Sequence, residues 1–556
     1  MTSLPIPGMI PGRRFPALPC GPARGLARLP LALAAAAAVA SAQAAHEHGA
    51  DTPGARPPAR VLGTVAFPNA GAPAAQAPLR RALAHQHNFH YREAREAFRE
   101  ASRADPGLAL ARWGEALTFT APVWGLESLD SSHAALARLG ATPEARLARA
   151  RTADERAFGA AVEAFYTEGT LAERARRFAT AARRWADARG AAAARAPQEA
   201  GAFAALALLV QAYTGADAEE GALLDTAAAY AERVLARNPR HPGAAHYLTH
   251  AYDRPDAARR GLAAARAYDR IAPDAEHALH MPSHIYHQLG MWGDMARSNE
   301  RAWAASRASG QPDWHSLEWL QYAYLQQGRW SASRALVDTA RRVLAAGPPP
   351  DALLSPDAAH AVAALAWRHG VESGDWSAWT PDLDAGIGAD TLAGPGTSAR
   401  ARGMAMMRAY RSAHARLARA SPASAAFGAD TAAVSAAARR LATRSEGYRH
   451  ALGAQLEARL ALLRGDSAAA RLALGRALAA NAEGGPAIPG AASSRELLAA
   501  LDLAQGRVRE AIAGYERALV ATPLRSAALL GLARAQRAAG MSDAAARSEA
   551  AHARAA

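Results

Sequence analysis

The sequence predicts an all-α fold, an α-α superhelix in which antiparallel helix pairs stack as a solenoid. Half of the 556 residues are hydrophobic, but much of this share is alanine. Because alanine forms helices readily and buries little area, the composition favours closely packed helices over a sheet. A spacing of small, aromatic, small and proline residues also recurs along the chain, which is typical of stacked units that share one core.

The N-terminus has the pattern of an export signal over residues 1–44. Arginines extend to Arg28, an apolar run covers Leu29–Ala40, and Ala42-Gln43-Ala44 fits a small-x-small cleavage site. We therefore expect an exported protein, periplasmic or secreted. The single cysteine, Cys20, lies in this leader, so the mature chain is expected to form no disulfide and to offer no thiolate to a metal.

Composition and periodicity divide the rest of the chain. No stretch after the leader is long and apolar enough to span a membrane. The helical stretch at about 142–195 does not fit the repeat spacing. The expected parts are a flexible segment at residues 45–74, a repeat solenoid with a histidine-lined groove at 75–346, a proline-rich connection at 347–357 and further helical repeats at 358–556.

The net charge of +14 does not predict nucleic-acid binding. All basic residues other than histidine are arginines, and they are scattered among alanines without alternating with stacking aromatic residues. Removal of the leader, which contains four arginines and no acidic residue, leaves +10. The expected partner is a protein, peptide or small molecule, and the sequence does not predict an oligomeric state.

Individual repeats can be recognised at both ends and in the middle of the chain. Their spacing resembles that of the tetratricopeptide repeat, in which small residues let paired helices approach to about 8–10 Å, an aromatic residue fills the gap and a proline stops the second helix. Three units in the middle begin near Pro242, at Glu276 and near Trp314. The matching positions are Tyr91, Ala94, Phe98, Ala101 and Pro106 in the first unit, and Gly506, Ala511, Tyr515, Ala518 and Pro523 in a unit near the C-terminus.

Histidines gather at the positions of these middle units that face the concave groove in tetratricopeptide repeats. In the second unit their spacing of three, four and three residues predicts one stripe along a helix face. We therefore expect three adjacent helices to bring seven histidines and two carboxylates to one surface. The residues are His246, His250 and Asp253 in the first unit, His277, His280, His284 and His287 in the second, and His315, Glu318 and Tyr322 in the third.

The stretch from His241 to Trp292 is similar to a group of mostly uncharacterised bacterial tetratricopeptide-repeat proteins. Its most characteristic phrase is HALHMPSHI, at residues 277–285. The segments FHYREAREAFREASRADPGLALARWGEAL and ELLAALDLAQGRVREAIAGYERAL resemble the same group. The resemblance implies the fold, but it implies no activity.

The histidine spacing is typical of a metal site. The pairs His246/His250 and His280/His284 are four residues apart, so both rings of a pair can reach one ion, and neighbouring helices can bring the pairs together. Asp253 is expected to supply a further ligand or to orient a ring. Imidazole and carboxylate ligands suit a divalent transition metal, and the residues do not distinguish zinc, copper, nickel and iron.

Two other interpretations of the same surface stay open. The groove is predicted to bind a peptide or small molecule through His277, His287, His315, Glu318 and Tyr322, with sensitivity to pH near neutrality. Alternatively, hydrogen bonds from the histidines hold adjacent helices together.

Two details bear on these interpretations. Pro282, inside the stripe, is expected to start or kink a helix, and His85, His87 and His90 are interpreted as turn and packing residues. No P-loop, GxSxG or HExxH motif occurs. We therefore predict a binding or scaffold protein rather than an enzyme, with a metal-dependent enzyme or a metal-handling protein as the alternative.

Overall fold

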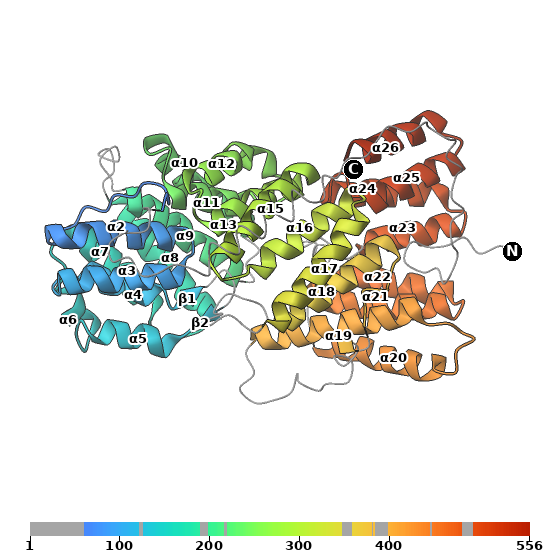
Figure 1. Cartoon of the computed structure of the whole chain (residues 1–556), viewed down its shortest axis with the longest axis horizontal. Coiled ribbons are helices and arrows are strands. Elements are labelled where there is room, and N and C mark those ends of the chain that lie inside the picture. Colours follow the sequence, from blue (N-terminus) through green and yellow to red (C-terminus); the bar gives the residue numbers. More distant parts are fainter. Residues whose placement is uncertain are drawn as a thin grey trace, which may run out of the picture. The chain divides into compact units, whose positions relative to one another are not determined.

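The computed structural model describes residues 60–121, 126–188, 198–215, 220–346, 358–380, 382–383, 399–444, 447–480 and 493–555. Within these residues the chain is helical apart from turns, an extended N-terminal segment and one short antiparallel pair of strands (Figure 1). The prediction of an all-α fold is confirmed. The leader at residues 1–44 lies outside the described residues.

The described elements follow one another along the chain, and those from residue 61 onward belong to one compact unit. None of the described helices is long and apolar enough to cross a membrane. The strands are β1 (Thr120–Ala121) and β2 (Leu126–Glu127). The helices are α2 (Pro73–His87), α3 (Tyr91–Ala104), α4 (Ala109–Leu117), α5 (Leu129–Ala137), α6 (Pro143–Leu147), α7 (Ala153–Phe165), α8 (Leu171–Asp187), α9 (Gln198–Thr214), α10 (Glu220–Arg237), α11 (Pro242–Ala251), α12 (Ala258–Ile271), α13 (Glu276–His280), α14 (Pro282–Gln288), α15 (Trp292–Ala308), α16 (Trp314–Gln326), α17 (Trp330–Ala345), α18 (Ala358–Ser373), α19 (Ala399–Arg419), α20 (Phe427–Arg444), α21 (Gly447–Leu463), α22 (Ser467–Ala480), α23 (Ser494–Ala504), α24 (Val508–Ala521), α25 (Ser526–Ala538) and α26 (Ser542–Ala555).

Helices that follow one another in the chain pack against each other, as the repeat spacing predicts. The helices α24 and α26 begin at Val508 and Ser542, 34 residues apart, which is the length of about one tetratricopeptide repeat. Glycines in the left-handed region end the first helix of several pairs, for example Gly328 with φ +67° and Gly506 with φ +75°. Only glycine adopts this conformation without a steric penalty, so these glycines define the turns within the pairs.

Aromatic residues fill the gap between small residues of neighbouring helices, as predicted. Phe98 of α3 lies over Gly114 of α4, where an added Cβ would come within 2.3 Å of the ring. Tyr515 of α24 lies in the same way over Gly531 of α25, where the distance would be 2.4 Å. The first unit and a unit near the C-terminus therefore pack in the same register.

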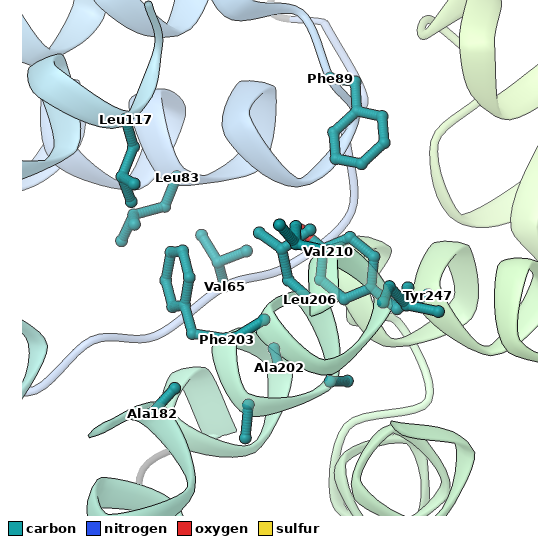
Figure 2. Packing of buried hydrophobic residues seen from close by; sticks show 14 of the residues in the cluster. Val65, Leu83, Phe89, Leu117, Ala182, Ala202, Phe203, Leu206, Val210 and Tyr247 are labelled. Carbon is teal, nitrogen blue, oxygen red and sulfur yellow. The ribbon is translucent and has the colours of Figure 1, made fainter. Parts of the chain in front are cut away.

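The first hydrophobic core lies among helices α2 to α14 and includes an extended segment that precedes α2. Figure 2 shows Val65 of this segment beside Phe203 and Leu206 of α9. Leu62 and Phe67 are buried as well, and the Thr64 backbone N–H donates to the Arg240 carbonyl oxygen at 2.9 Å. Residues 61–72 therefore pack on the core, although the composition predicts flexibility over residues 45–74. The segment is rich in Pro, Gly and Ala, but its three apolar side chains are spaced so that they can be buried.

A second core continues across the predicted connection at residues 347–357, which lies outside the described residues. Trp303 of α15 and Trp314 of α16 share one cluster of buried side chains with Trp367 of α18, Tyr410 of α19 and Leu456 of α21. The helices before and after the connection thus bury their apolar faces against one another.

The turn between α24 and α25 contacts repeats about two hundred residues earlier in the chain. The Trp292 Nε1–H donates to the Leu524 carbonyl oxygen at 3.0 Å, and the Ser526 backbone N–H donates to Gln326 Oε1 at 3.0 Å. Gly290 adjoins this turn so closely that an added Cβ would lie 2.5 Å from the Pro523 carbonyl oxygen. The C-terminal repeats are therefore packed on α14 to α16, next to the predicted groove residues.

Candidate metal centre

Three consecutive units position the predicted groove residues, through α11, the pair α13–α14, and α16. The stripe in the middle unit does not lie on one helix, because Pro282 ends α13 and begins α14. Proline has no N–H to donate to the preceding turn, which is the reason for the break. Met281 nevertheless keeps right-handed helical angles, φ −54° and ψ −34°, so the histidines on either side of the break still share one face.

The sequence His-Pro-Gly at the start of α11 fixes the first of these helices. The His241 side chain caps the helix, with its Nδ1 accepting from the Ala244 backbone N–H at 3.2 Å. Pro242 occupies the first turn, where no N–H is needed. Gly243 leaves room for the His87 ring, since an added Cβ would lie 2.4 Å from His87 Nδ1.

The structure brings six of the seven predicted histidines together as two triads. We call His246, His250 and His277 the first triad, and His280, His284 and His315 the second triad; within each, one ring nitrogen per residue lies within 4.8 Å of the other two. Ligands of one tetrahedral zinc ion, at 2.0–2.1 Å from the metal, stand about 3.3 Å apart, so a bound ion would draw the rings slightly closer. The predicted set of His246, His250, His280 and His284 is thus divided between two groups, and His277 and His315, predicted as ligand-binding residues, join them.

The second triad contains two nitrogens that face each other without a hydrogen between them. His280 Nδ1 donates to Asn299 Oδ1 at 2.6 Å, and the amide orientation is fixed because Asn299 Nδ2 donates to the Met295 carbonyl oxygen. His284 Nδ1 donates to Asp253 Oδ2 at 2.7 Å. In neutral rings both Nε2 atoms then carry lone pairs, yet they lie 3.0 Å apart. At this distance the pair is favourable when one ring carries an additional proton or when both lone pairs bind a metal ion.

The first triad is built in a similar way around His246. Its Nδ1–H donates to the His87 carbonyl oxygen at 2.7 Å, so its Nε2 presents a lone pair to His277 Nε2 at 3.0 Å. A neutral His277 can meet this lone pair with its own Nε2–H. The third ring, His250, has a buried Nε2 without a hydrogen-bond partner among the described residues, so this nitrogen is free to coordinate an ion.

Burial keeps most of these rings in the neutral form that binds metals. Burial, reinforced by the neighbouring imidazoles, holds the pKa values of His246, His277 and His280 well below 6.5. The same causes lower the pKa of His250 to about 3. The pKa of His315 is also lowered, chiefly by burial. Neutral imidazoles are ready to coordinate an ion without first losing a proton.

Asp253 orients a ring rather than facing the centre of a triad. Besides accepting from His284, its second oxygen accepts from Gln288 Nε2 at 3.0 Å. Burial by itself would raise the pKa of this carboxyl group, but His284 and the two hydrogen bonds lower it to about 2, so the group is ionised. Of the two predicted roles, ligand and orienting partner, the geometry favours the second.

Aromatic rings form the walls around both triads. Trp319 stacks on His284 with ring centroids 4.3 Å apart, and Phe89 packs edge-on against His246 at 4.2 Å. Phe89 has φ +58°, unusual for a residue with a side chain. Its position in the turn after α2 lets the preceding His87 carbonyl oxygen reach His246. These apolar walls lower the polarity around the rings, which strengthens electrostatic interactions within the site.

The remaining three predicted groove residues lie outside the triads. The Glu318 carboxylate pairs with the Arg368 guanidinium at 3.0 Å, and the Tyr322 hydroxyl accepts from Arg525 at 3.2 Å. His287 is buried among aromatic rings, and this burial lowers its pKa to about 4. Two of the five residues predicted to bind a groove ligand are therefore engaged by arginines of later helices.

A third cluster also brings three possible ligand atoms within 4.8 Å of one another, but its ring nitrogens are all hydrogen-bonded within the protein. His87, His241 and Glu199 are fully buried, with His87 Nε2 at 2.7 Å and His241 Nε2 at 3.3 Å from the carboxylate. His241 Nδ1 already accepts from a backbone N–H, so its Nε2–H points to Glu199. The Tyr247 hydroxyl lies 2.9 Å from His87 Nδ1 and can donate to it, which leaves the His87 Nε2–H for the carboxylate. Every ring nitrogen has a partner, and we interpret this cluster as a structural network.

Two residues near the triads have roles that the sequence does not predict. His87, predicted as a turn and packing residue, lies in this buried network with a carboxylate 112 positions away. Asn299 lies on the second helix of its unit, away from the groove positions. An asparagine on the apolar side of α15, fully buried, is the signal that could have identified it.

The described chain is thus an all-α protein of tetratricopeptide-like helix pairs with two converging histidine triads. No protein-family model matches the sequence, and no curated protein matches it. Solved structures that align with it include a human IFIT1 dimer with m7Gppp-AAAA, at 13% identity over 81% of this chain and 89% of that chain with a TM-score of 0.32. The APC/C hetero-tetramer Cut9–Hcn1 aligns at 13% identity over 85% and 78%, with a TM-score of 0.29. The TPR domain of P58(IPK) aligns at 12% identity over 84% and 99%, with a TM-score of 0.18. At these scores the alignments say nothing about what this chain binds.

Proposed function

We propose that this chain is a metal-binding repeat protein in which each histidine triad holds one divalent transition metal ion. The observation that carries the proposal is the pair of Nε2 atoms of His280 and His284, 3.0 Å apart, whose Nδ1 hydrogens are both donated elsewhere. Orienting hydrogen bonds of this kind, from the outer nitrogen to a carboxylate or carbonyl oxygen, are typical of histidines that bind metals. The helical repeats would serve as the rigid scaffold that holds the triads.

The ligand set suits a divalent transition metal. The six triad residues offer imidazole nitrogen and neither thiolate nor carboxylate. Imidazole suits zinc, copper, nickel and iron, and among divalent ions of this row copper generally binds such sites most tightly. Metal handling and metal-dependent catalysis are both compatible with a site of three protein ligands, because such a site leaves one coordination position open.

Stoichiometry tests the proposal directly. The full chain, purified without a tag and stripped with a chelator, is titrated with zinc or copper and its metal content is measured by mass spectrometry. We expect two ions per chain, one after His280→Ala, and one after His246→Ala. His133→Ala is the matched control: it removes a helix histidine whose Nε2 lies 3.1 Å from the Tyr166 carbonyl oxygen, outside both triads. A chain that takes up no metal, or variants that keep both ions, would overturn the proposal.

The same preparations also test the groove for the other predicted ligands. Binding of a peptide or small molecule has less support, because Glu318 and Tyr322 are held by Arg368 and Arg525. Affinity for such a ligand that survives chelation and the His280→Ala substitution would favour this second candidate.

We also propose that the protein is exported, on the support of the leader pattern at residues 1–44. The mass of the mature N-terminus, measured on protein expressed with its own leader, tests this. Cleavage after residue 44 is the expected result, and retention of the leader would contradict it. The closer resemblance to the bacterial group with the HALHMPSHI phrase stays a prediction.

A further inference from the structure

The two triads share their supporting helices. Helix α11 supplies His246 and His250 to the first triad, and Asp253, just beyond its end, orients His284 of the second. Helix α13 supplies His277 to the first triad and His280 to the second. The two triads are therefore built on the same helices and lie next to each other.

The spacing along α13 sets how far apart the triads lie. His277 and His280 are three residues apart, a rise of about 4.5 Å along a helix. The ring centroids across the boundary, His250 to His284 and His277 to His280, are both 6.0 Å apart. Two-metal sites have ions about 3.5–4 Å apart. The rings that separate the triads are farther apart than this, so ions bound on the facing sides of the two triads are the arrangement in which one small ligand would contact both.

The charge of such a pair indicates the kind of ligand it would bind. Six neutral imidazoles leave the full charge of two divalent ions uncompensated, and Asp253, the ionised carboxylate beside His284, faces away from the ions. Each ion would keep one open coordination position. His277, His284 and His315 are only half-buried, so these three rings keep some contact with solvent.

We propose that the two triads form a single dinuclear centre, in which two transition metal ions share one small anionic oxygen ligand such as hydroxide. This inference rests on the proposed function, since it requires an ion in each triad. It goes beyond metal binding because a shared oxygen ligand between two ions is an arrangement that suits the activation of water or of a small oxygen-containing substrate.

Magnetic coupling tests the proposal with copper as the only added ligand. The full chain is loaded with Cu(II), its copper content is measured, and its electron paramagnetic resonance signal is integrated to count unpaired spins. Ions that share a bridging oxygen couple antiferromagnetically, so we expect two copper ions per chain and the loss of most of the signal. His277→Ala is expected to keep one copper ion, in the second triad, and to regain one spin for each copper ion.

The controls separate this inference from the proposed function. If His277→Ala does not fold, as judged by circular dichroism, His315→Ala removes a half-buried ligand of the second triad and is expected to give the same full spin count. His133→Ala should remain coupled like the unaltered chain. Two copper ions with a full spin count would refute the dinuclear centre and leave metal binding intact, whereas a chain without copper would refute both.

Discussion

Replacement of Asn299 by leucine should weaken metal binding at the second triad alone. Asn299 is fully buried on α15, and its Oδ1 accepts the His280 Nδ1–H at 2.6 Å. Leucine has a similar size but cannot accept this hydrogen. In the metal-free chain the proton can then move to His280 Nε2 and be donated to His284, which lies 3.0 Å away. The apo chain thus recovers a hydrogen bond.

The metal-bound form of this variant cannot use the alternative hydrogen bond from His280 Nε2. The ion needs the His280 Nε2 lone pair, which returns the proton to Nδ1 and leaves a buried N–H whose remaining acceptor is the distant Ser283 Oγ at 3.5 Å. An unsatisfied buried group costs about 1–3 kcal/mol, and about 1.4 kcal/mol corresponds to a tenfold change in affinity. We therefore expect the affinity of the second triad to fall by a factor of roughly 5 to 150, while the first triad keeps its affinity.

Competitive titration with a chromogenic chelator measures the two affinities. Ser298→Ala is the matched control, since Ser298 precedes Asn299 on α15 and donates to the Leu279 carbonyl oxygen at 2.5 Å, without contacting the ring nitrogens. Equal affinities in Asn299→Leu and the unaltered chain would refute the assignment of hydrogens on which the metal site depends. A loss at both triads alike would show that the substitution acts through general destabilisation.

Three further predictions concern the site and the fold. Asp253→Asn removes the ionised partner of the His284 ring and should lower metal affinity by about 10–100-fold, which the same titration measures against an unchanged circular dichroism spectrum. The metal-free chain should lose stability in acid, because burial lowers the pKa of His250 to about 3 and that of His287 to about 4 from the ordinary 6.5. At pH values between its folded pKa and 6.5, each ring takes up a proton when the chain unfolds. The free energy of unfolding should therefore fall by about 1.4 kcal/mol per pH unit for each histidine as the pH drops from 6.5 towards 4. A free energy of urea unfolding that does not change with pH, measured with chelator present, would contradict this. Gly531→Ala places a Cβ 2.4 Å from an aromatic ring and should destabilise the chain by about 1–3 kcal/mol. Gly475→Ala on α22, whose Cβ meets no atom within 4 Å, should stabilise the chain by about 0.5–1 kcal/mol. Equal effects of the two substitutions on thermal unfolding would show that the repeat packing is misassigned.

Repeat spacing predicts much of this fold because each unit packs on its chain neighbours. The small and aromatic positions at Phe98 and Tyr515 identify helix pairs, and the structure forms them. Groove positions within a unit also predict that His246, His277 and His280 lie near one another, since their places depend on helix geometry alone.

Partners from outside the repeat pattern could not be predicted. Glu199 of α9 and His87 of α2 meet in a buried pair although they belong to different units. The Arg525 guanidinium reaches Tyr322 from a turn far along the chain. The division into two triads likewise depends on a one-turn offset between α11 and α13, which spacing within a single helix does not reveal. Tertiary contacts of this kind decide which groove residues are available to a ligand.

The contact of Leu524 with Trp292 has a consequence for how the chain can be shortened. In an ordinary repeat array, units touch only adjacent units, so a terminal unit can be removed and the others stay folded. Here the turn at residues 522–526 supports the helices that carry the histidines, through Trp292 and Gln326. Truncation before residue 522 would therefore expose the middle of the array, and we expect a minimal fragment that keeps the histidine triads in place to include the last two helix pairs.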